Sequence, residues 1–144
     1  MRHLRLAVLA TGATILIGCS ANSAKPAPEA SAYLRLQALP PADPAKFANV
    51  HDYKSWRNPY LMVRKDGVAL LDFSNNEERL LKFEELPDAL ARLSASAWPY
   101  GRVVAVIEDR AKVPDDQALI RKNRGIVAGT LESMHILINW VPSV

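Results

Sequence analysis

Between residues 60 and 81 the chain alternates short apolar stretches with polar turns. Tyr60-Leu61-Met62-Val63-Arg64 and Val68-Ala69-Leu70-Leu71 flank Lys65-Asp66-Gly67. Because Asp-Gly favours the positive φ angles of tight turns, this pattern predicts a β-hairpin. Ser74-Asn75-Asn76 is a second turn signal, and we expect Arg79-Leu80-Leu81 after it to form a brief third strand.

The segment from Phe83 to Leu93 has the periodicity of a helix. Leu86, Leu90 and Leu93 recur at i, i+4 and i+7 and form one apolar stripe. Pro87 fits a helix only within the first turn, where its missing N–H removes no hydrogen bond. The helix is therefore predicted to begin shortly before this proline.

Two strands and a second helix are predicted in the last third of the chain. Arg102 to Ile107 is rich in β-branched residues and apolar on both faces, which is typical of a central, covered strand. His135 to Val141 is the other strand. Between them a helix begins at Pro114, and Gly125 and Gly129 weaken it by about 1 kcal/mol each. The glycines mark either close packing on the sheet or an early helix end. The apolar side of this helix is expected to consist of Leu119, Ile120, Ile126, Val127 and Leu131.

The predicted order is hairpin, helix, strand, helix, strand. Two helices that cross in the same sense lie on one face of a mixed sheet, so we expect an α+β two-layer sandwich. Residues 33–144 form a single globular domain in this interpretation. Tyr33 to Gln37 is expected to be a short edge strand, and Ala45 to Trp56 a helical turn around Phe47 and Val50.

The N-terminal part of the chain has the pattern of a lipoprotein leader. A basic start precedes Leu6 to Ile17, an uncharged run that is shorter than the ~20 apolar residues needed to span a bilayer. Leu16-Ile17-Gly18-Cys19 looks like a bacterial lipobox, which predicts cleavage before Cys19 and lipidation of this residue. The alternatives are a cleaved secretory signal and a retained membrane anchor.

Residues 1–18 are thus the predicted signal peptide, and residues 19–32 are a flexible tether because Ser20 to Ala32 has no large apolar side chain. Lipidation of Cys19 leaves no cysteine for a disulfide, a thiolate metal site or a nucleophile. By resemblance to lipoprotein sorting in Gram-negative bacteria, Ser20 does not signal inner-membrane retention. The expected location is the periplasmic side of the outer membrane.

The mature chain is nearly neutral. Removal of Arg2 and Arg5 leaves 16 of the 18 basic residues beside 15 acidic ones. A nucleic-acid-binding surface needs a dense basic stripe, which the sequence lacks. The charge balance therefore indicates an ordinary soluble domain that does not bind nucleic acid.

These elements together resemble the periplasmic domain of the ExbD/TolR family of biopolymer-transport proteins. The resemblance implies a domain that dimerises and contacts envelope proteins or the cell wall. Family members carry an ionisable carboxylate in a membrane helix, whereas Leu6 to Ile17 contains no Asp or Glu, so proton coupling is not carried over. The matching features are Leu39-Pro40, Lys65-Asp66-Gly67, Phe83-Glu84-Glu85-Leu86-Pro87-Asp88-Ala89-Leu90, Val103 to Ile107, and the closing helix and strand up to Val141.

A catalytic alternative rests on His51-Asp52, which can act as a general base and its orienting group. No G-x-S-x-G nucleophile motif accompanies this pair, and a loop histidine beside an acidic neighbour explains it as well. His135 is similarly expected to be a strand-end residue hydrogen-bonded to backbone rather than a ligand.

The carboxylates from Glu108 to Asp116 offer acid–base chemistry or a cation site. Adjacent residues on a strand point to opposite faces, however, and Arg110 and Lys112 can neutralise these acids. A solvated loop that leads into a helix is the preferred interpretation, with no metal and no cofactor.

Two groups of residues are candidates for binding. The first is the densest basic cluster, which suits anionic lipid headgroups or cell-wall carboxylates or forms a solvated helix face. The second is a set of aromatic residues in predicted loops, which fill a groove for sugar or peptide or plug the ends of a small core. The candidates are Arg121, Lys122, Arg124, Trp56, Trp98 and Tyr100.

The leading hypothesis is a lipid-anchored periplasmic binding or scaffold module, monomeric or homodimeric, that contacts an envelope protein or peptidoglycan without catalysis. The alternative is a small envelope hydrolase that uses His51 or the Glu108–Asp116 carboxylates. In a third interpretation the chain is an accessory of a larger transport or secretion complex and exposes a strand edge for β-augmentation.

Overall fold

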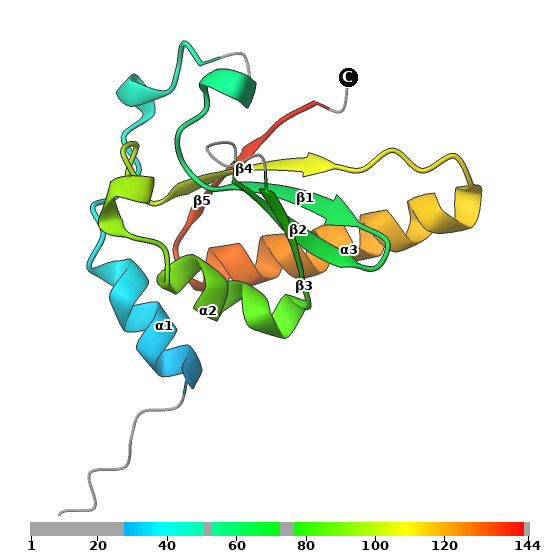
Figure 1. Cartoon of the computed structure of the whole chain (residues 1–144), viewed down its shortest axis with the longest axis horizontal. Coiled ribbons are helices and arrows are strands. Elements are labelled where there is room, and N and C mark those ends of the chain that lie inside the picture. Colours follow the sequence, from blue (N-terminus) through cyan, green and yellow to red (C-terminus); the bar gives the residue numbers. More distant parts are fainter. Residues whose placement is uncertain (1–27, 51–52, 73–76, 143–144) are drawn as a thin grey trace, which may run out of the picture.

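Five strands form one mixed sheet in the order β3-β2-β1-β4-β5, flanked by helices (Figure 1). The structure is a computed structural model and describes residues 28–50, 53–72 and 77–142. The strands are β1 (Tyr60–Arg64), β2 (Gly67–Asp72), β3 (Glu77–Leu81), β4 (Val103–Glu108) and β5 (Leu137–Trp140). The α-helices are α1 (Pro28–Gln37), α2 (Leu86–Ala91) and α3 (Pro114–Ser133). The short 3-10 segments are η1 (Pro44–Lys46), η2 (Tyr53–Ser55), η3 (Phe83–Glu85) and η4 (Ala95–Ala97).

The predicted hairpin is confirmed as β1 and β2, which pair antiparallel around a turn at Lys65 and Asp66. The expected third strand is β3, which pairs antiparallel with β2. Gly67 directly follows the turn, and a Cβ atom on it would lie 2.5 Å from the carbonyl oxygen of Leu81. Only glycine allows the two backbones to approach this closely.

The main core lies between one face of the sheet and the helices α2 and α3. β4 occupies an inner position, and its residues from Val103 to Val106 are fully buried, as predicted for a covered strand. Pro87 lies in the first turn of α2, also as predicted. The α+β class and the placement of both predicted helices on one face are thus confirmed. The core contains Leu61, Val63, Val68, Leu86, Leu90, Val104, Val106, Ile120, Val127 and Leu131.

Loops rather than helices cover the other face of the sheet. Val103 and Ala105 of β4 pack there with Trp56 and Tyr60 in a smaller core. Figure 1 shows η1 and η2 on the side of the sheet opposite α2 and α3. The turn expected around Phe47 is present as η1, which ends just before this residue.

The N-terminal helix α1 corrects two expectations. The strand expected at Tyr33 to Gln37 is wrong, because this segment is the second half of α1. The predicted tether is also helical from Pro28 onward, and Ala32, its predicted last residue, is fully buried. Ala32 and Leu36 are spaced i, i+4 on one buried side of the helix, whereas Leu34 is 64% exposed. The folded body therefore begins earlier than predicted.

Both interpretations of the glycines in α3 are wrong. The helix runs without a break to Ser133, so neither glycine ends it. A Cβ atom on Gly125 or Gly129 would meet nothing within 4 Å, so neither marks close packing on the sheet.

The predicted apolar side of α3 is only partly correct. Ile120, Val127 and Leu131 are buried, but Leu119 is 46% and Ile126 39% exposed. These two side chains lie beside the buried row, because one residue along a helix turns the side chain by about 100°. The polar residue Asn123 belongs to the buried row instead. The buried residues of α3 are Ile120, Asn123, Val127 and Leu131.

α3 ends in a Schellman-type cap centred on His135, whose φ of 55° is in the left-handed region. The N–H of His135 donates to the carbonyl of Glu132 at 2.9 Å, and the N–H of Ile136 donates to that of Leu131 at 3.0 Å. The imidazole Nδ1 lies 3.2 Å from the hydroxyl of Tyr33 in α1. His135 therefore belongs to the helix cap that precedes β5.

Candidate functional site

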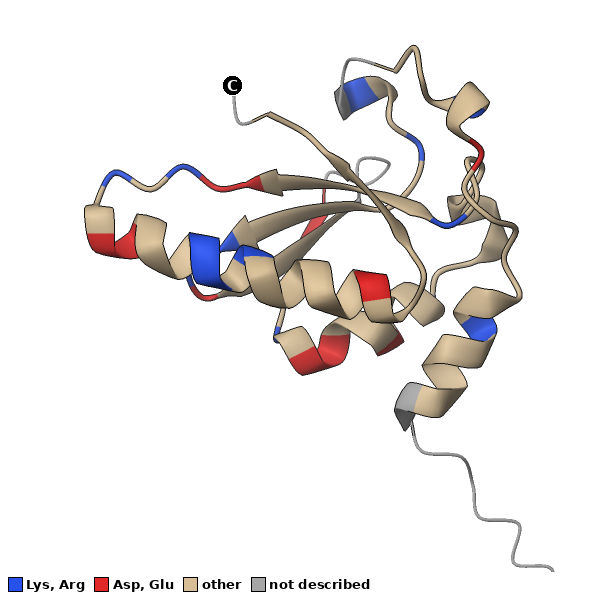
Figure 2. Ribbon diagram, turned by 180° about the vertical axis from the view of Figure 1, so that it is seen from behind, with Lys and Arg blue, Asp and Glu red and all other residues tan. Residues whose placement is uncertain are grey.

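The predicted basic cluster lies on the exposed middle of α3 (Figure 2). Arg124 donates from Nη1 to Oε1 of Glu108 at 2.8 Å, and its guanidinium carbon lies 4.2 Å from the ring centroid of Trp140. This ion pair and cation–π contact connect α3 to β4 and β5. Arg121 and Lys122 have no ion pair within the described ranges, so they are the available cations of the cluster.

β5 forms one edge of the sheet and lacks the charges that protect the other edge. It contains only Leu, Ile, Asn and Trp, and among the described strands it pairs only with β4. Leu137 is 46% and Trp140 36% exposed. The opposite edge, β3, exposes Glu77, Glu78 and Arg79. Charged residues on an edge strand disfavour pairing with another chain, so β5 is the edge open to strand addition.

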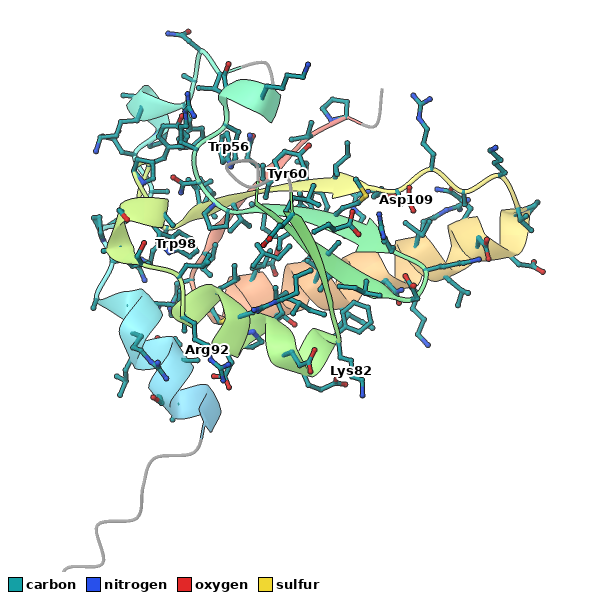
Figure 3. All side chains as sticks on the ribbon, in the orientation of Figure 1. Trp56, Tyr60, Lys82, Arg92, Trp98 and Asp109 are labelled. Carbon is teal, nitrogen blue, oxygen red and sulfur yellow. The ribbon has the colours of Figure 1, made fainter. Side chains whose placement is uncertain are left out.

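The three candidate aromatic residues are divided between the two cores. Trp56 and Tyr100 lie on the loop side of the sheet, with ring centroids 5.2 Å apart. Trp98 belongs to the core on the helix side and is 2% exposed (Figure 3). Trp56 is also nearly buried, at 4% exposed, and its Nε1 donates to the carbonyl of Pro59 at 3.2 Å. The indole rings therefore fill cores and present no open face for stacking.

Asn58 is a buried polar residue that the sequence interpretation missed. Its Nδ2 donates to the carbonyls of Gly101 and Val103, both at 2.7 Å. Its Oδ1 accepts from the N–H of Tyr100 at 2.9 Å. These bonds join the loop before β1 to the loop before β4. The Asn-Pro dipeptide at this point signals a turn but not these distant partners.

The loop that Asn58 holds forms one wall of a cleft with a volume of about 630 Å³. The ends of β2 and β3 form the second wall, and the segment 93–97 before and within η4 forms the third. Among the residues whose side chains the structure describes, three cations, Lys54, Arg57 and Arg79, line the cleft together with the carboxylate of Glu77. None of these charged residues was a candidate from the sequence.

Three of the four carboxylates behind the hydrolase alternative contact cations, and the fourth, Asp115, is exposed. Oδ2 of Asp109 lies 4.0 Å from Nε of Arg64, and Nζ of Lys65 donates to Oδ2 of Asp116 at 2.9 Å. This hydrogen bond and the attraction of Asp116 raise the pKa of Lys65 above its ordinary value of 10.5. With Glu108 held by α3, these acids form three separate ion pairs in place of one cluster.

Several predicted sites lie outside the residues that the structure describes. They are His51, the candidate base, and Cys19, the candidate lipidation site, together with the leader and the tether up to residue 27. Within the described ranges, no three or more His, Cys, Asp and Glu side chains gather where they could hold a metal ion. The helices of these same ranges include none long and apolar enough to cross a membrane.

No protein-family model matches this chain, and no curated protein or solved structure matches it. The resemblance to the ExbD/TolR family therefore rests on the short sequence motifs quoted above. Function has to be argued from the geometry of the sheet edge, the basic helix and the cleft.

Proposed function

We propose that this chain is a lipid-anchored periplasmic module that binds another component of the cell envelope, without catalysis, through the free edge of β5. The observation that carries this proposal is the contrast between the two edges of the sheet. β3 is blunted by charges, while β5 exposes the apolar side chains of Leu137 and Trp140. An open apolar edge strand tends to pair with strands of other chains. Because only one of the two edges of this sheet has this character, that edge points to a binding role.

The backbone of β5 supports strand addition. The N–H of Leu137 donates to the carbonyl of Arg102, and that of Val141 to the carbonyl of Val106, both at 2.9 Å. Because N–H groups alternate in direction along a strand, those of Ile138 and Trp140 face away from β4. They offer a ladder to a strand of another protein or of a second copy of this chain.

The surroundings of this edge also favour binding over catalysis. Arg121 precedes Arg124, which contacts Trp140, by almost one helical turn, so Arg121 lies on the side of α3 next to β5. Such cations attract an acidic partner or the carboxylates of the cell wall. Three of the four carboxylates of the rival hydrolase, those of Glu108, Asp109 and Asp116, are meanwhile held in ion pairs.

Membrane attachment is proposed from the lipobox and is tested separately. A Cys19→Ser variant of the full chain, expressed in a Gram-negative host, should lose its attached acyl chains by mass spectrometry. It should also move from the membrane pellet to the soluble periplasmic fraction. Lipidation elsewhere, or an unchanged membrane fraction in this variant, contradicts the proposed anchor.

The binding edge is tested by photo-crosslinking in cells. A photoreactive amino acid at position 137 should give specific adducts with an envelope protein, a second copy or a wall fragment. The matched control is position 80 in β3, because Leu80 is 47% and Leu137 46% exposed. Equal adducts from both positions, or none from position 137 in abundant folded protein, would show that β5 is not the binding edge.

A further inference from the structure

We infer that the cleft beside β2 and β3 is a binding site whose ligand is an acidic peptide segment with apolar side chains. It lies on the side of the sheet away from β5, since β2 and β3 are at one end of the strand order and β5 at the other. The inference therefore does not depend on strand addition at β5. The volume of about 630 Å³ is within the range of roughly 300–1,000 Å³ that is usual for ligand sites.

The charge of the cleft favours a carboxylate. Arg57 and Arg79 come from opposite walls, both are exposed, and neither has an ion pair with any residue in the described part of the chain. Arg64 and Arg124, by contrast, are held by carboxylates: Arg64 contacts Glu78 at 2.6 Å, and Arg124 contacts Glu108. A guanidinium group binds a carboxylate with two parallel hydrogen bonds, so the two cleft arginines suit acidic side chains.

The rest of the lining favours a peptide over a sugar or a nucleobase. Leu70, Leu93 and Ala97 are partly exposed and supply aliphatic surface for an apolar side chain. Trp56 also lines the cleft but is only 4% exposed, so it offers no ring face for stacking. Ser94 and Ser96, whose hydroxyl oxygens lie 2.7 Å apart, add polar groups that can also bond to a peptide backbone.

The cleft is also held in shape before any ligand binds. The three hydrogen bonds of Asn58 and the indole bond of Trp56 to Pro59 fix the wall that carries Arg57. A wall that is already ordered loses little conformational entropy when it binds a ligand. The backbone of Arg57 is therefore already in position before a ligand enters the cleft.

The test uses the full lipidated chain in nanodiscs and two fluorescent octapeptides, one alternating Val and Glu and one alternating Val and Gln. Fluorescence anisotropy should show saturable binding of the Glu peptide and at least tenfold weaker binding of the Gln peptide. Added salt should weaken the binding of the Glu peptide, because the arginines are exposed. Nanodiscs without protein give the background.

Two double variants locate the binding. R57Q/R79Q should reduce the affinity for the Glu peptide at least tenfold, whereas R35Q/R110Q, which removes two exposed arginines outside both the cleft and the basic cluster of α3, should leave it unchanged. Near-UV circular dichroism checks that both variants are folded. Equal binding of the two peptides, an equal loss in both double variants, or no saturable binding would each overturn the inference.

Discussion

The side chains of two buried asparagines form hydrogen bonds with backbone groups in loops and at strand ends. Asn58 bridges the loops before β1 and β4 with three hydrogen bonds. Asn123 reaches from α3 to the hairpin turn, where its Nδ2 donates to the carbonyls of Arg64 at 2.7 Å and Lys65 at 3.1 Å. Buried backbone groups need such partners, so each asparagine is important for stability at one place.

Replacement of Asn58 by alanine is expected to lower the free energy of unfolding by about 1–3 kcal/mol, because it leaves buried backbone groups without partners. Urea unfolding followed by tryptophan fluorescence measures the change. The matched control is Asn139→Ala in β5, which removes a less buried amide and should change stability by less than about 0.5 kcal/mol. Equal effects would mean that the bonds of Asn58 are replaced by water.

The ion pair at the hairpin tip gives a prediction about titration. Asp116 raises the pKa of Lys65 above 10.5, so Asp116→Asn should lower the pKa of Lys65 toward that value. A raised pKa in the folded protein means that the contribution to stability is present below the unfolded pKa and is lost as the pH rises through the folded pKa. NMR titration of the Lys65 side chain between pH 9 and 12, a window chosen around the ordinary lysine value, tests this. An unchanged pKa in the variant would contradict the contact.

At the residue scale, sequence reasoning found types of residue more readily than their partners. The aromatic candidates and the basic cluster were identifiable from local composition, but Trp56 and Trp98 turn out to lie in different cores. Arg57 and Arg79 line the same cleft although they belong to different segments of the chain. Local patterns contain no information about such long-range neighbours.

Among the elements, α3 contains two glycines that lower its stability and can be replaced by alanine. Both of its interior glycines face open space, so alanine fits without strain and restricts the unfolded chain. Gly125→Ala and Gly129→Ala are each expected to raise the free energy of unfolding by roughly 0.5–1 kcal/mol. Thermal and urea unfolding of the two variants measure the gain.

Gly67 provides the control for these substitutions. Gly67→Ala is expected to destabilise the protein, because its Cβ atom would lie 2.5 Å from the carbonyl oxygen of Leu81. If alanine at positions 125 or 129 destabilises the protein instead, α3 must have a close neighbour at these positions in solution. Such a result would point to a contact between copies of the chain.

Elements with strong local signals were predicted well, and α1 was not. The hairpin and the helix around Pro87 follow from turn chemistry and from leucine spacing, both of which are local. In α1, Tyr33 to Gln37 alternates as a strand does, but burial of Ala32 and Leu36 against the rest of the domain decides for a helix. Alanine is too small to reveal a buried face in a sequence pattern.

At the scale of the whole molecule, α1 is part of the cooperative fold. Leu36 is 1% exposed in the main core, and α1 packs along α2. The side-chain amide of Gln37 donates from Nε2 to the carbonyl of Met134 at 2.9 Å and accepts from Nη1 of Arg102. The N-terminal helix therefore ties the end of α3 to the start of β4.

Leu36→Ala is accordingly expected to cost about 2–5 kcal/mol, the range for a large-to-small substitution in a core. Leu34→Ala is the control, since Leu34 is 64% exposed in the same helix and should change stability by less than about 0.5 kcal/mol. Hydrogen exchange of α1 should be as slow as that of β4 in the original protein. If Leu36→Ala costs no more than Leu34→Ala, α1 unfolds independently of the domain.

The early start of α1 sets how far the proposed anchor lets the domain move from the lipid. Nine residue steps separate Cys19 from Pro28, and a chain extends at most about 3.6 Å per step, so the reach is about 32 Å at full extension. With a domain that began at Tyr33, the same estimate would be about 50 Å. If Cys19 is lipidated as proposed, the domain would stay within this reach of the membrane, and its partners would have to approach the membrane surface.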